Sequence, residues 1–351
     1  MNRILCVDNK PKDIQTQSSL LNKKGFDVVV VDNPNRGLEL LRNDHFSLLL
    51  TDIEMKPIDG IELINRVHKE NIPVAIIIIT AYYDRYEDQI KNLHIDFFIK
   101  PLPNISETER MEKFVRTIQK TANPFFLSME EYLAKTDDEK LRIDQRIWHF
   151  RGDWIEKELN QINAAWIMVC GDEVIDSSNS YQNIPNEAQI RKIANDKGKM
   201  PFLFCHSTII EESPWSNVGK NHVEDYYPTI ELQINGRTHI ADFDTGSPET
   251  YISDDIINID FNFSMRGRTK IHNVSHLKYL QKVEITIPLD EGGNVNSIEY
   301  SLFVIPQWAE SEFISVNEVR KCLAGRDLLN KFPIEVRLIG RDKYKTKVYS
   351  I

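Results

Sequence analysis

The sequence predicts a multidomain chain that joins an α/β domain, a small α+β domain and an all-β domain. Apolar runs alternate with helical patterns over residues 1–122, which is typical of the α/β class. Short alternating strands separated by turn signals fill residues 222–351, and weaker helical and strand patterns lie at residues 123–221. A chain of 351 residues is long enough for two or three domains.

Each strand predicted in the first domain is an apolar run that ends in polar residues. Such runs lie at residues 3–9, 48–52, 74–80 and 97–101. Helical patterns follow the same region at residues 36–43, 60–70 and 107–120. Strands that are apolar on both faces and alternate with helices predict a doubly wound parallel sheet.

Polar side chains mark the carboxyl ends of these strands, where ligands bind on doubly wound sheets. They are Asp8, Asp52, Thr80 and Lys100. The pattern resembles the response-regulator receiver domain, which has a flavodoxin-like fold. The resemblance implies that Asp52 accepts a phosphoryl group, that Thr80 is a switch hydroxyl and that Lys100 contacts the phosphate.

The same resemblance implies Mg²⁺ at the phosphorylation site, held by Asp8, Asp52 and the backbone of Glu54. The family usually has two adjacent acids after the first strand, whereas the second position here is Asn9. Asn9 offers an oxygen but no charge, so we expect weaker Mg²⁺ binding and slower phosphorylation. The aromatic switch position is Phe97. A receiver-shaped domain that is not phosphorylated is the alternative.

The middle region, residues 123–221, is expected to be a helical connector followed by a small α+β domain of unknown function. Apolar residues at helical spacing over residues 128–162 predict a helix that Gly152 interrupts. This helix either connects or dimerises the chain, or packs on its own domain. A hairpin is predicted at residues 165–176, a helix at 187–196, a strand at 202–205 and a linker at 211–223.

The last region begins with the clearest hairpin signal in the chain. An alternating strand at residues 228–234 meets Asn235-Gly236, and the return strand at 238–243 delivers Asp244 at its end. Further strands are predicted at residues 259–263, 283–287, 300–305 and 334–338.

Two motifs in this region resemble the two halves of a retropepsin-like aspartic protease subunit. One is Asp244-Thr245-Gly246, and the other is the apolar-apolar-Gly325-Arg326-Asp327 turn. The alternative is that Asp244-Thr245-Gly246 is an ordinary acidic turn after a strand, without a catalytic role. Because the chemistry needs two aspartates and the chain has one such motif, the active site would be built between two copies.

The resemblance also implies roles for the neighbouring residues. Thr245 would brace the two catalytic loops, and Gly246 would allow close approach of an extended substrate. Leu323-Ala324-Gly325 would pack beneath the catalytic loop, and Arg326 would pair with an acid near that loop, either Glu249 or Asp327. The flap is expected between residues 266 and 279, without the usual glycine-rich tip.

Composition limits the choice of function and partners. A formal charge of −10 argues against nucleic acid, and no apolar run is long enough to cross a membrane. The four cysteines lack metal-ligand spacing, which favours reduced thiols in the cytoplasm, and the N-terminus does not resemble a signal peptide.

The sequence therefore predicts a phosphorylation-regulated cytoplasmic aspartic endopeptidase of a two-component pathway, active as a homodimer. Its partners would be a sensor histidine kinase or phosphotransfer protein and an unknown protein substrate. The protease site needs no cofactor. The alternative is a phospho-dependent module that binds peptides or acts as a scaffold without cutting.

Overall fold

The computed structural model describes residues 3–93, 95–102, 107–210, 228–315, 319–339 and 342–350. The chain divides into two compact units. The first comprises Met1–Trp154, Cys170–Asp172 and Arg191–Pro201, and the second Ile155–Val169, Glu173–Ile190 and Phe202–Ile351. The expected linker at 211–223 lies outside the described residues. The division into three domains stays a prediction.

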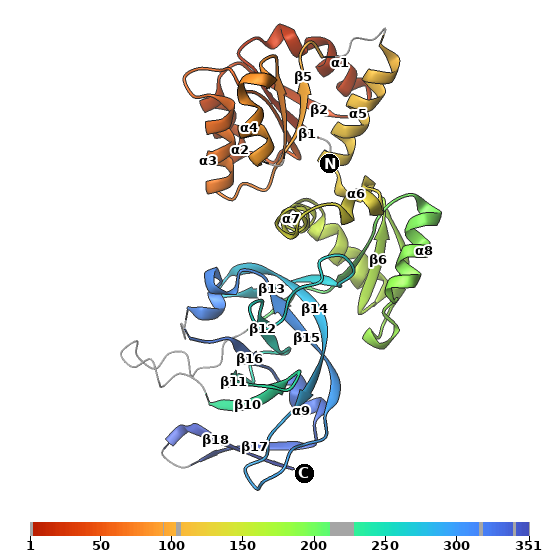
Figure 1. Cartoon of the computed structure of the whole chain (residues 1–351). Helices are drawn as coiled ribbons and strands as arrows, with labels where there is room; N and C mark the ends of the chain where they lie inside the picture. The colour runs from red at the N-terminus through yellow and green to blue at the C-terminus, as the bar shows by residue number, and fades with distance from the viewer. Residues whose placement is uncertain are drawn as a thin grey trace. The chain divides into compact units, whose positions relative to one another are not determined.

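The first unit contains a five-stranded parallel sheet, which confirms the predicted doubly wound arrangement (Figure 1). The strands are β1 Arg3–Val7, β2 Asp27–Val31, β3 Leu48–Asp52, β4 Ala75–Thr80 and β5 Asp96–Ile99. Their order in the sheet is β2-β1-β3-β4-β5. Parallel pairs such as Cys6 beside Leu50 and Leu50 beside Ile77 bring the carboxyl ends of the strands to one edge.

Helices cover both faces of this sheet, so the unit has two separate cores. They are α1 Gln15–Lys23 (after a 3₁₀ turn, Pro11–Ile14), α2 Pro34–Asn43, α3 Gly60–Lys69, α4 Tyr83–Leu93 and α5 Thr108–Ala122. Successive residues of β3 point into different cores. Leu49 packs in the core that contains Leu63 of α3, and Leu50 in the core that contains Phe114 of α5. This double burial explains why the strands are continuously apolar.

Two helices follow, and the second corrects the sequence analysis. They are α6 Met129–Leu133, after the 3₁₀ turn Pro124–Phe126, and α7 Asp137–Ile162. Helix α7 runs through Gly152, so the expected interruption is wrong. Gly152, Trp148 and Ile155 are all buried, and this packing outweighs the cost of about 1 kcal/mol for glycine in a helix. No helix in the described part of the chain, α7 included, is long and apolar enough to cross a membrane.

Three strands and one helix of the middle region lie where the sequence predicts them: β6 Trp166–Cys170, β7 Glu173–Ser178, α8 Glu187–Lys197 and β8 Pro201–Cys205. A 3₁₀ turn, Tyr181–Asn183, and the short strand β9, Thr208–Ile209, were not predicted. The strands do not form a sheet of their own, because Phe204 of β8 pairs with Arg266 of β13. They extend the sheet of the C-terminal barrel.

The barrel is the main feature of the second unit. Its six strands are β10 Thr229–Ile234, β11 Arg237–Phe243, β12 Tyr251–Ser253, β14 Val274–Thr286, β15 Ile298–Ile305 and β16 Cys322–Ala324. A further strand, β13 Arg266–Ile271, pairs with β14 outside the closed ring. Two 3₁₀ turns, Trp308–Glu310 and Glu312–Ile314, lie between β15 and β16. Strand β16 is followed by α9, Asp327–Lys331, and by the paired strands β17, Ile334–Ile339, and β18, Asp342–Ser350. The order β10-β11-β16-β12-β15-β14 closes when Ile234 of β10 pairs with Ile285 of β14. The region is β-rich and contains a six-stranded barrel, and a separate all-β domain of retropepsin-like character stays a prediction.

One predicted strand, at residues 259–263, is wrong. These residues form turns, in which the Asp260 carboxylate accepts a hydrogen bond of 3.0 Å from the Asn262 amide. Asp and Asn side chains bond readily to nearby backbone and so compete with strand pairing.

Candidate functional site

The structure brings together three of the polar residues predicted at the edge of the parallel sheet. Asp8 follows β1, Asp52 ends β3 and Lys100 follows β5. The Lys100 ammonium donates to Asp8 Oδ2 at 2.8 Å and to Asp52 Oδ2 at 2.9 Å. Both carboxylates are buried, with exposed fractions of 2% and 7%. One cation therefore joins two carboxylates in a largely water-free position.

The local backbone fixes these side chains. Asp52 Oδ1 accepts from the Ile53 amide at 2.7 Å, and Asp8 Oδ1 accepts from the Lys10 amide at 2.8 Å. Helix α3 begins at Gly60, very close to the Asp52 backbone. A Cβ atom at this position would lie only 2.1 Å from the Asp52 carbonyl oxygen. Glycine at residue 60 is thus required for the loop after Asp52 to close.

Burial and charge act against each other in this cluster. Burial raises the pKa of Asp8 above its usual value, although the hydrogen bonds from Lys100 and Lys10 act to lower it. For Lys100, burial acts to lower the pKa, but the hydrogen bonds to Asp8 and Asp52 outweigh it and the pKa is raised. Lys100 therefore stays cationic beside Asp52, as a contact for an anionic phosphoryl group requires.

Thr80 and Glu54 lie near this edge but have other partners. Thr80 is fully buried at the end of β4, and its hydroxyl accepts from the Tyr82 amide at 3.0 Å. Its carbonyl accepts from the Lys100 amide at 2.8 Å. The Glu54 side chain pairs with Arg85 of α4, a contact that the sequence analysis missed.

The two positions that depart from the family pattern are exposed. Asn9 follows Asp8 with its side chain exposed. Phe97 is 37% exposed and stacks on Tyr83, with ring centroids 4.5 Å apart and an angle of 14° between the planes. Sequence reasoning missed this stack, because Tyr83 lies in a different element.

Known proteins resemble this part of the chain. The family described as response regulator receiver domain matches residues 4–110. The transcriptional regulatory protein ZraR of Klebsiella oxytoca is 34% identical over 101 residues, which cover 28% of this chain and 23% of ZraR. FixJ of Bradyrhizobium diazoefficiens is 27% identical over 121 residues, which cover 34% of this chain and 59% of FixJ. The solved structure of the response regulator TrrA from Thermotoga maritima, in complex with Mg(2+)-BeF, is 24% identical, covers 34% of this chain and 99% of that chain, and has a TM-score of 0.29.

The N-terminal part of the chain is a response regulator receiver domain. This chain covers 23% of ZraR and 59% of FixJ, so it shares only part of each relative. The match with the receiver family ends at residue 110, before the barrel begins.

Asp244 is the central residue of the barrel's candidate site. It follows β11 and is 1% exposed. Asp244 Oδ1 accepts from the Gly246 amide at 2.8 Å, and the Asp244 amide donates to the Ala324 carbonyl at 3.0 Å. Thr245, which lies between Asp244 and Gly246 in the chain, is exposed. The loop thus holds one carboxylate in place and presents a threonine at the surface.

The predicted turn at residues 325–327 packs against this loop. A Cβ atom at Gly325 would lie 2.3 Å from the Glu249 carbonyl oxygen, so only glycine fits there. Asp327 accepts from the Thr250 amide at 3.0 Å and from the Thr250 hydroxyl at 2.7 Å. That hydroxyl accepts from the Gly325 amide at 3.1 Å. Burial raises the pKa of Asp327, although the hydrogen bonds from Thr250 act to lower it.

Arg326 does not have the partner expected for it. Its side chain is exposed, and among the described residues it forms no ion pair with Glu249 or Asp327, so that pairing is wrong. The buried arginine of this region is Arg320, whose Nε donates to Asp242 Oδ2 at 2.7 Å. The sequence gave no signal for this pair, because the two residues lie 78 positions apart.

We expect Arg320→Met to destabilise the second unit by about 3–5 kcal/mol, because it leaves the Asp242 carboxylate buried without its cation. Lys321→Met is the matched control, since Lys321 pairs with Asp255 at the surface. Urea unfolding followed by tryptophan fluorescence measures both. Equal effects of the two substitutions would contradict the prediction.

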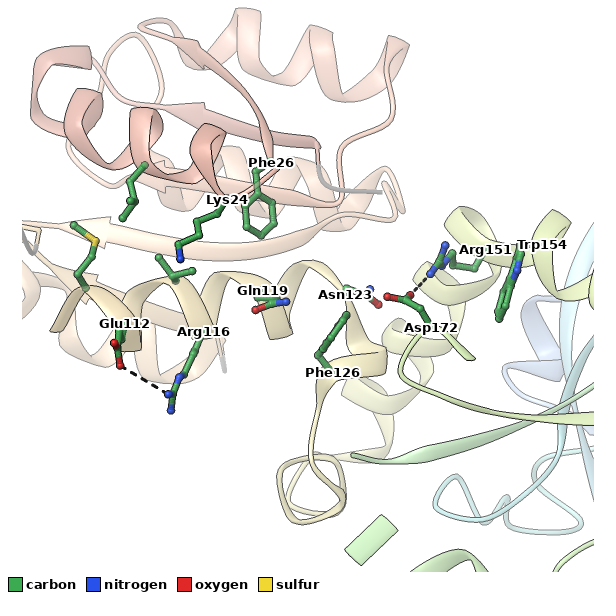
Figure 2. A pocket seen from close by; sticks show the side chains of 13 residues that line it. Lys24, Phe26, Glu112, Arg116, Gln119, Asn123, Phe126, Arg151, Trp154 and Asp172 are labelled. Atoms are coloured by element: carbon green, nitrogen blue, oxygen red, sulfur yellow. Dashed lines mark hydrogen bonds and ion pairs between the residues drawn. The ribbon is translucent and has the colours of Figure 1, made fainter. Parts of the chain in front are cut away.

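A pocket of about 930 Å³ in the first unit contains none of these site residues (Figure 2). Its lining includes Phe26, Phe126 and Trp154, together with charged side chains such as Lys24. Arg116 is paired with Glu112 at 3.8 Å, and Arg151 with Asp172. The pocket therefore has no place in the chemistry considered below.

Proposed function

We propose that the chain is a phosphorylation-regulated aspartic endopeptidase of a two-component signalling pathway, active as a homodimer. The observation that carries the proposal is the Asp244 loop, which follows a strand of a closed barrel. The Gly325–Asp327 turn packs against this loop and is hydrogen-bonded to it through Thr250. The same constellation was expected from the two sequence motifs. An acidic turn without function would need neither the buried carboxylate nor the close approach at Gly325.

In this proposal two copies of Asp244 form the catalytic pair. Two carboxylates held close together share one proton, so one is ionised and the other is not, and they titrate as a unit. The ionised carboxylate takes a proton from water as its oxygen attacks the peptide carbonyl. The protonated one supplies its proton to the carbonyl oxygen. When the carbon–nitrogen bond breaks, the first carboxyl passes the proton taken from water to the leaving amine, and the second takes a proton back from a hydroxyl of the tetrahedral intermediate. The exposed Thr245 is available to brace the partner's loop.

A hairpin supports the peptide-binding part of the proposal. Strands β13 and β14 pair from Arg266 opposite Tyr279 to Ile271 opposite Val274, where the flap was expected. The turn between them uses His272 and Asn273, both with positive φ angles, of 47° and 67°. The outer edge of β13 is paired with β8 and β9, and β15 pairs with β14 only from Tyr279 onward. An extended peptide would therefore add by hydrogen bonds along the start of β14, with side-chain pockets giving selectivity.

In the receiver domain we assign phosphoryl transfer to Asp52. Its carboxylate attacks phosphorus of a phosphohistidine on a sensor kinase or phosphotransfer protein, so that an O–P bond forms and the N–P bond breaks. Lys100, held 2.9 Å from Asp52, would then contact the phosphoryl oxygens. Thr80 is the candidate switch hydroxyl, because it ends the adjacent strand and is fully buried.

The residues present fit Mg²⁺. Asp8 and Asp52 offer hard carboxylate oxygens at one buried edge, and Mg²⁺ uses one or two carboxylates with several waters. The backbone of Glu54 and the Asn9 amide could add oxygens. Across the described residues no three or more His, Cys, Asp or Glu side chains gather to hold a metal, so the carboxylate count is low. When bound, the ion would neutralise charge on the phosphoryl oxygens.

Asn9→Asp is expected to tighten Mg²⁺ binding by about tenfold, because it adds a carboxylate beside Asp8. Titration calorimetry on the full chain measures the change. Asn92→Asp is the control, since Asn92 is exposed on α4 and adds the same charge elsewhere in the domain. An unchanged affinity in Asn9→Asp would exclude residue 9 from the metal site.

Incubating the purified chain with a peptide library, with and without acetyl phosphate, tests the proposal as a whole. Mass spectrometry of the peptides should reveal new termini, at a rate that depends on the phosphodonor. Retention of peptides without any cleavage would instead favour a phospho-dependent binding module.

A further inference from the structure

Lys278 is a fully buried lysine in the second strand of the hairpin β13–β14, outside the catalytic loop. Its ammonium donates to Glu249 Oε2 at 2.6 Å and to the Thr208 hydroxyl at 3.0 Å, and it lies 4.1 Å from the centre of the Phe303 ring. A charge taken fully out of water is tolerated only when it is paired and hydrogen-bonded in this way.

The partners of Lys278 come from separate parts of the second unit. Glu249 lies five residues after Asp244 in the chain, Thr208 belongs to β9, and Tyr251 belongs to β12. The Tyr251 hydroxyl donates to Glu249 Oε2 at 2.6 Å and lies 2.8 Å from the Thr208 hydroxyl. It also lies 3.1 Å from the hydroxyl of Thr269 in β13. One partly buried carboxylate oxygen, Oε2 of Glu249, thus connects the catalytic loop, the hairpin and the middle segment.

Backbone pairing connects the same segments. The outer edge of β13 is covered, because Thr269 pairs with Thr208 of β9 and Arg266 with Phe204 of β8. The strands approach closely at Gly267, where a Cβ atom would lie 2.7 Å from Cys205 Sγ and 2.9 Å from Lys278 Cε. Glycine at this position lets β8 lie directly against the hairpin.

We propose that Lys278 is a positioning residue that fixes the hairpin β13–β14 to the Asp244 loop, and that strands β8 and β9 of the middle segment form part of the same clamp. The proposal rests on the proposed protease, in which a peptide must enter beside this hairpin. Substrate access is then controlled by residues 201–209, which belong to the middle of the chain. Movement of that segment would move the hairpin through Glu249 and Thr208.

Backbone hydrogen exchange of the full-length chain tests the clamp without using catalysis. Lys278→Met should lower protection roughly 100-fold in β9, β13–β14 and the loop at residues 244–250 together, because one member of a buried ion pair is left alone. Protection in the hairpin β10–β11 should stay unchanged. Lys282→Met is the control on the same strand, since Lys282 pairs with Glu299 at the surface.

The Gly267→Ala variant provides a second test of the clamp in case the Lys278→Met variant does not fold. It keeps every charge but pushes β8 away from β13, so it should open the same three segments. A uniform loss of protection over the whole barrel, or no loss in these segments, would overturn the clamp. If the wild-type chain cleaves no peptide while the three segments still open together, the protease proposal fails and the clamp stands.

Discussion

Replacing Asp244 with Asn is expected to abolish peptide cleavage, with a loss of at least about 1,000-fold. The amide cannot exchange a proton with water or with the second aspartate, so general acid–base catalysis ends. Its oxygen can still accept the 2.8 Å hydrogen bond from the Gly246 amide, so the loop should keep its shape. Asp260→Asn is the matched control, because Asp260 lies in an exposed turn and Asn can keep its bond to the Asn262 amide.

Mixing experiments separate a shared active site from a site within one chain. With Asp244→Asn chains in about ninefold excess, random pairing leaves roughly one wild-type chain in ten with a wild-type partner. Activity per wild-type chain should therefore fall to about one tenth. If activity instead followed only the amount of wild-type chain, the catalytic pair would not be shared between copies.

The residues that local sequence places at strand ends were the ones that could be predicted. Asp8, Asp52 and Lys100 meet because parallel strands bring their carboxyl ends to one edge, a rule that needs no knowledge of side-chain packing. Asp244 and Gly325 were singled out because their motifs resemble those of a retropepsin-like subunit, and the Asn-Gly turn supported a strand that ends at Asp244.

Long-range partners could not be predicted. Lys278 and Glu249 are 29 residues apart, and Arg320 and Asp242 are 78 apart, so no periodic pattern connects them. The sequence analysis expected an ion pair for Arg326, because that residue belongs to the motif. In the structure Arg326 is exposed, and the arginine that is buried in an ion pair is Arg320. Pairing of β13 with β9 was likewise invisible, since a two-residue strand has no pattern of its own.

The receiver domain gives a physical route to regulation. A protease that needs two chains is controlled by anything that brings the chains together or reorients them. When two domains share one chain, association of one raises the effective concentration of the other into the millimolar range if the linker permits. A tenfold change in assembled protease then requires only about 1.4 kcal/mol of coupling.

Phosphorylation of Asp52 is therefore expected to raise peptide cleavage at least about tenfold. Acetyl phosphate with Mg²⁺ should add about 80 Da to the intact chain, the mass of HPO₃. Asp52→Ala should show neither the adduct nor the activation, whereas Asp88→Ala, at an exposed position of α4, should behave as wild type. Light scattering on the same samples separates two mechanisms: activation with a doubled mass supports assembly, and activation at constant mass supports release of a preformed dimer. If the chain carries the adduct and neither mass nor activity changes, the receiver domain does not control the barrel.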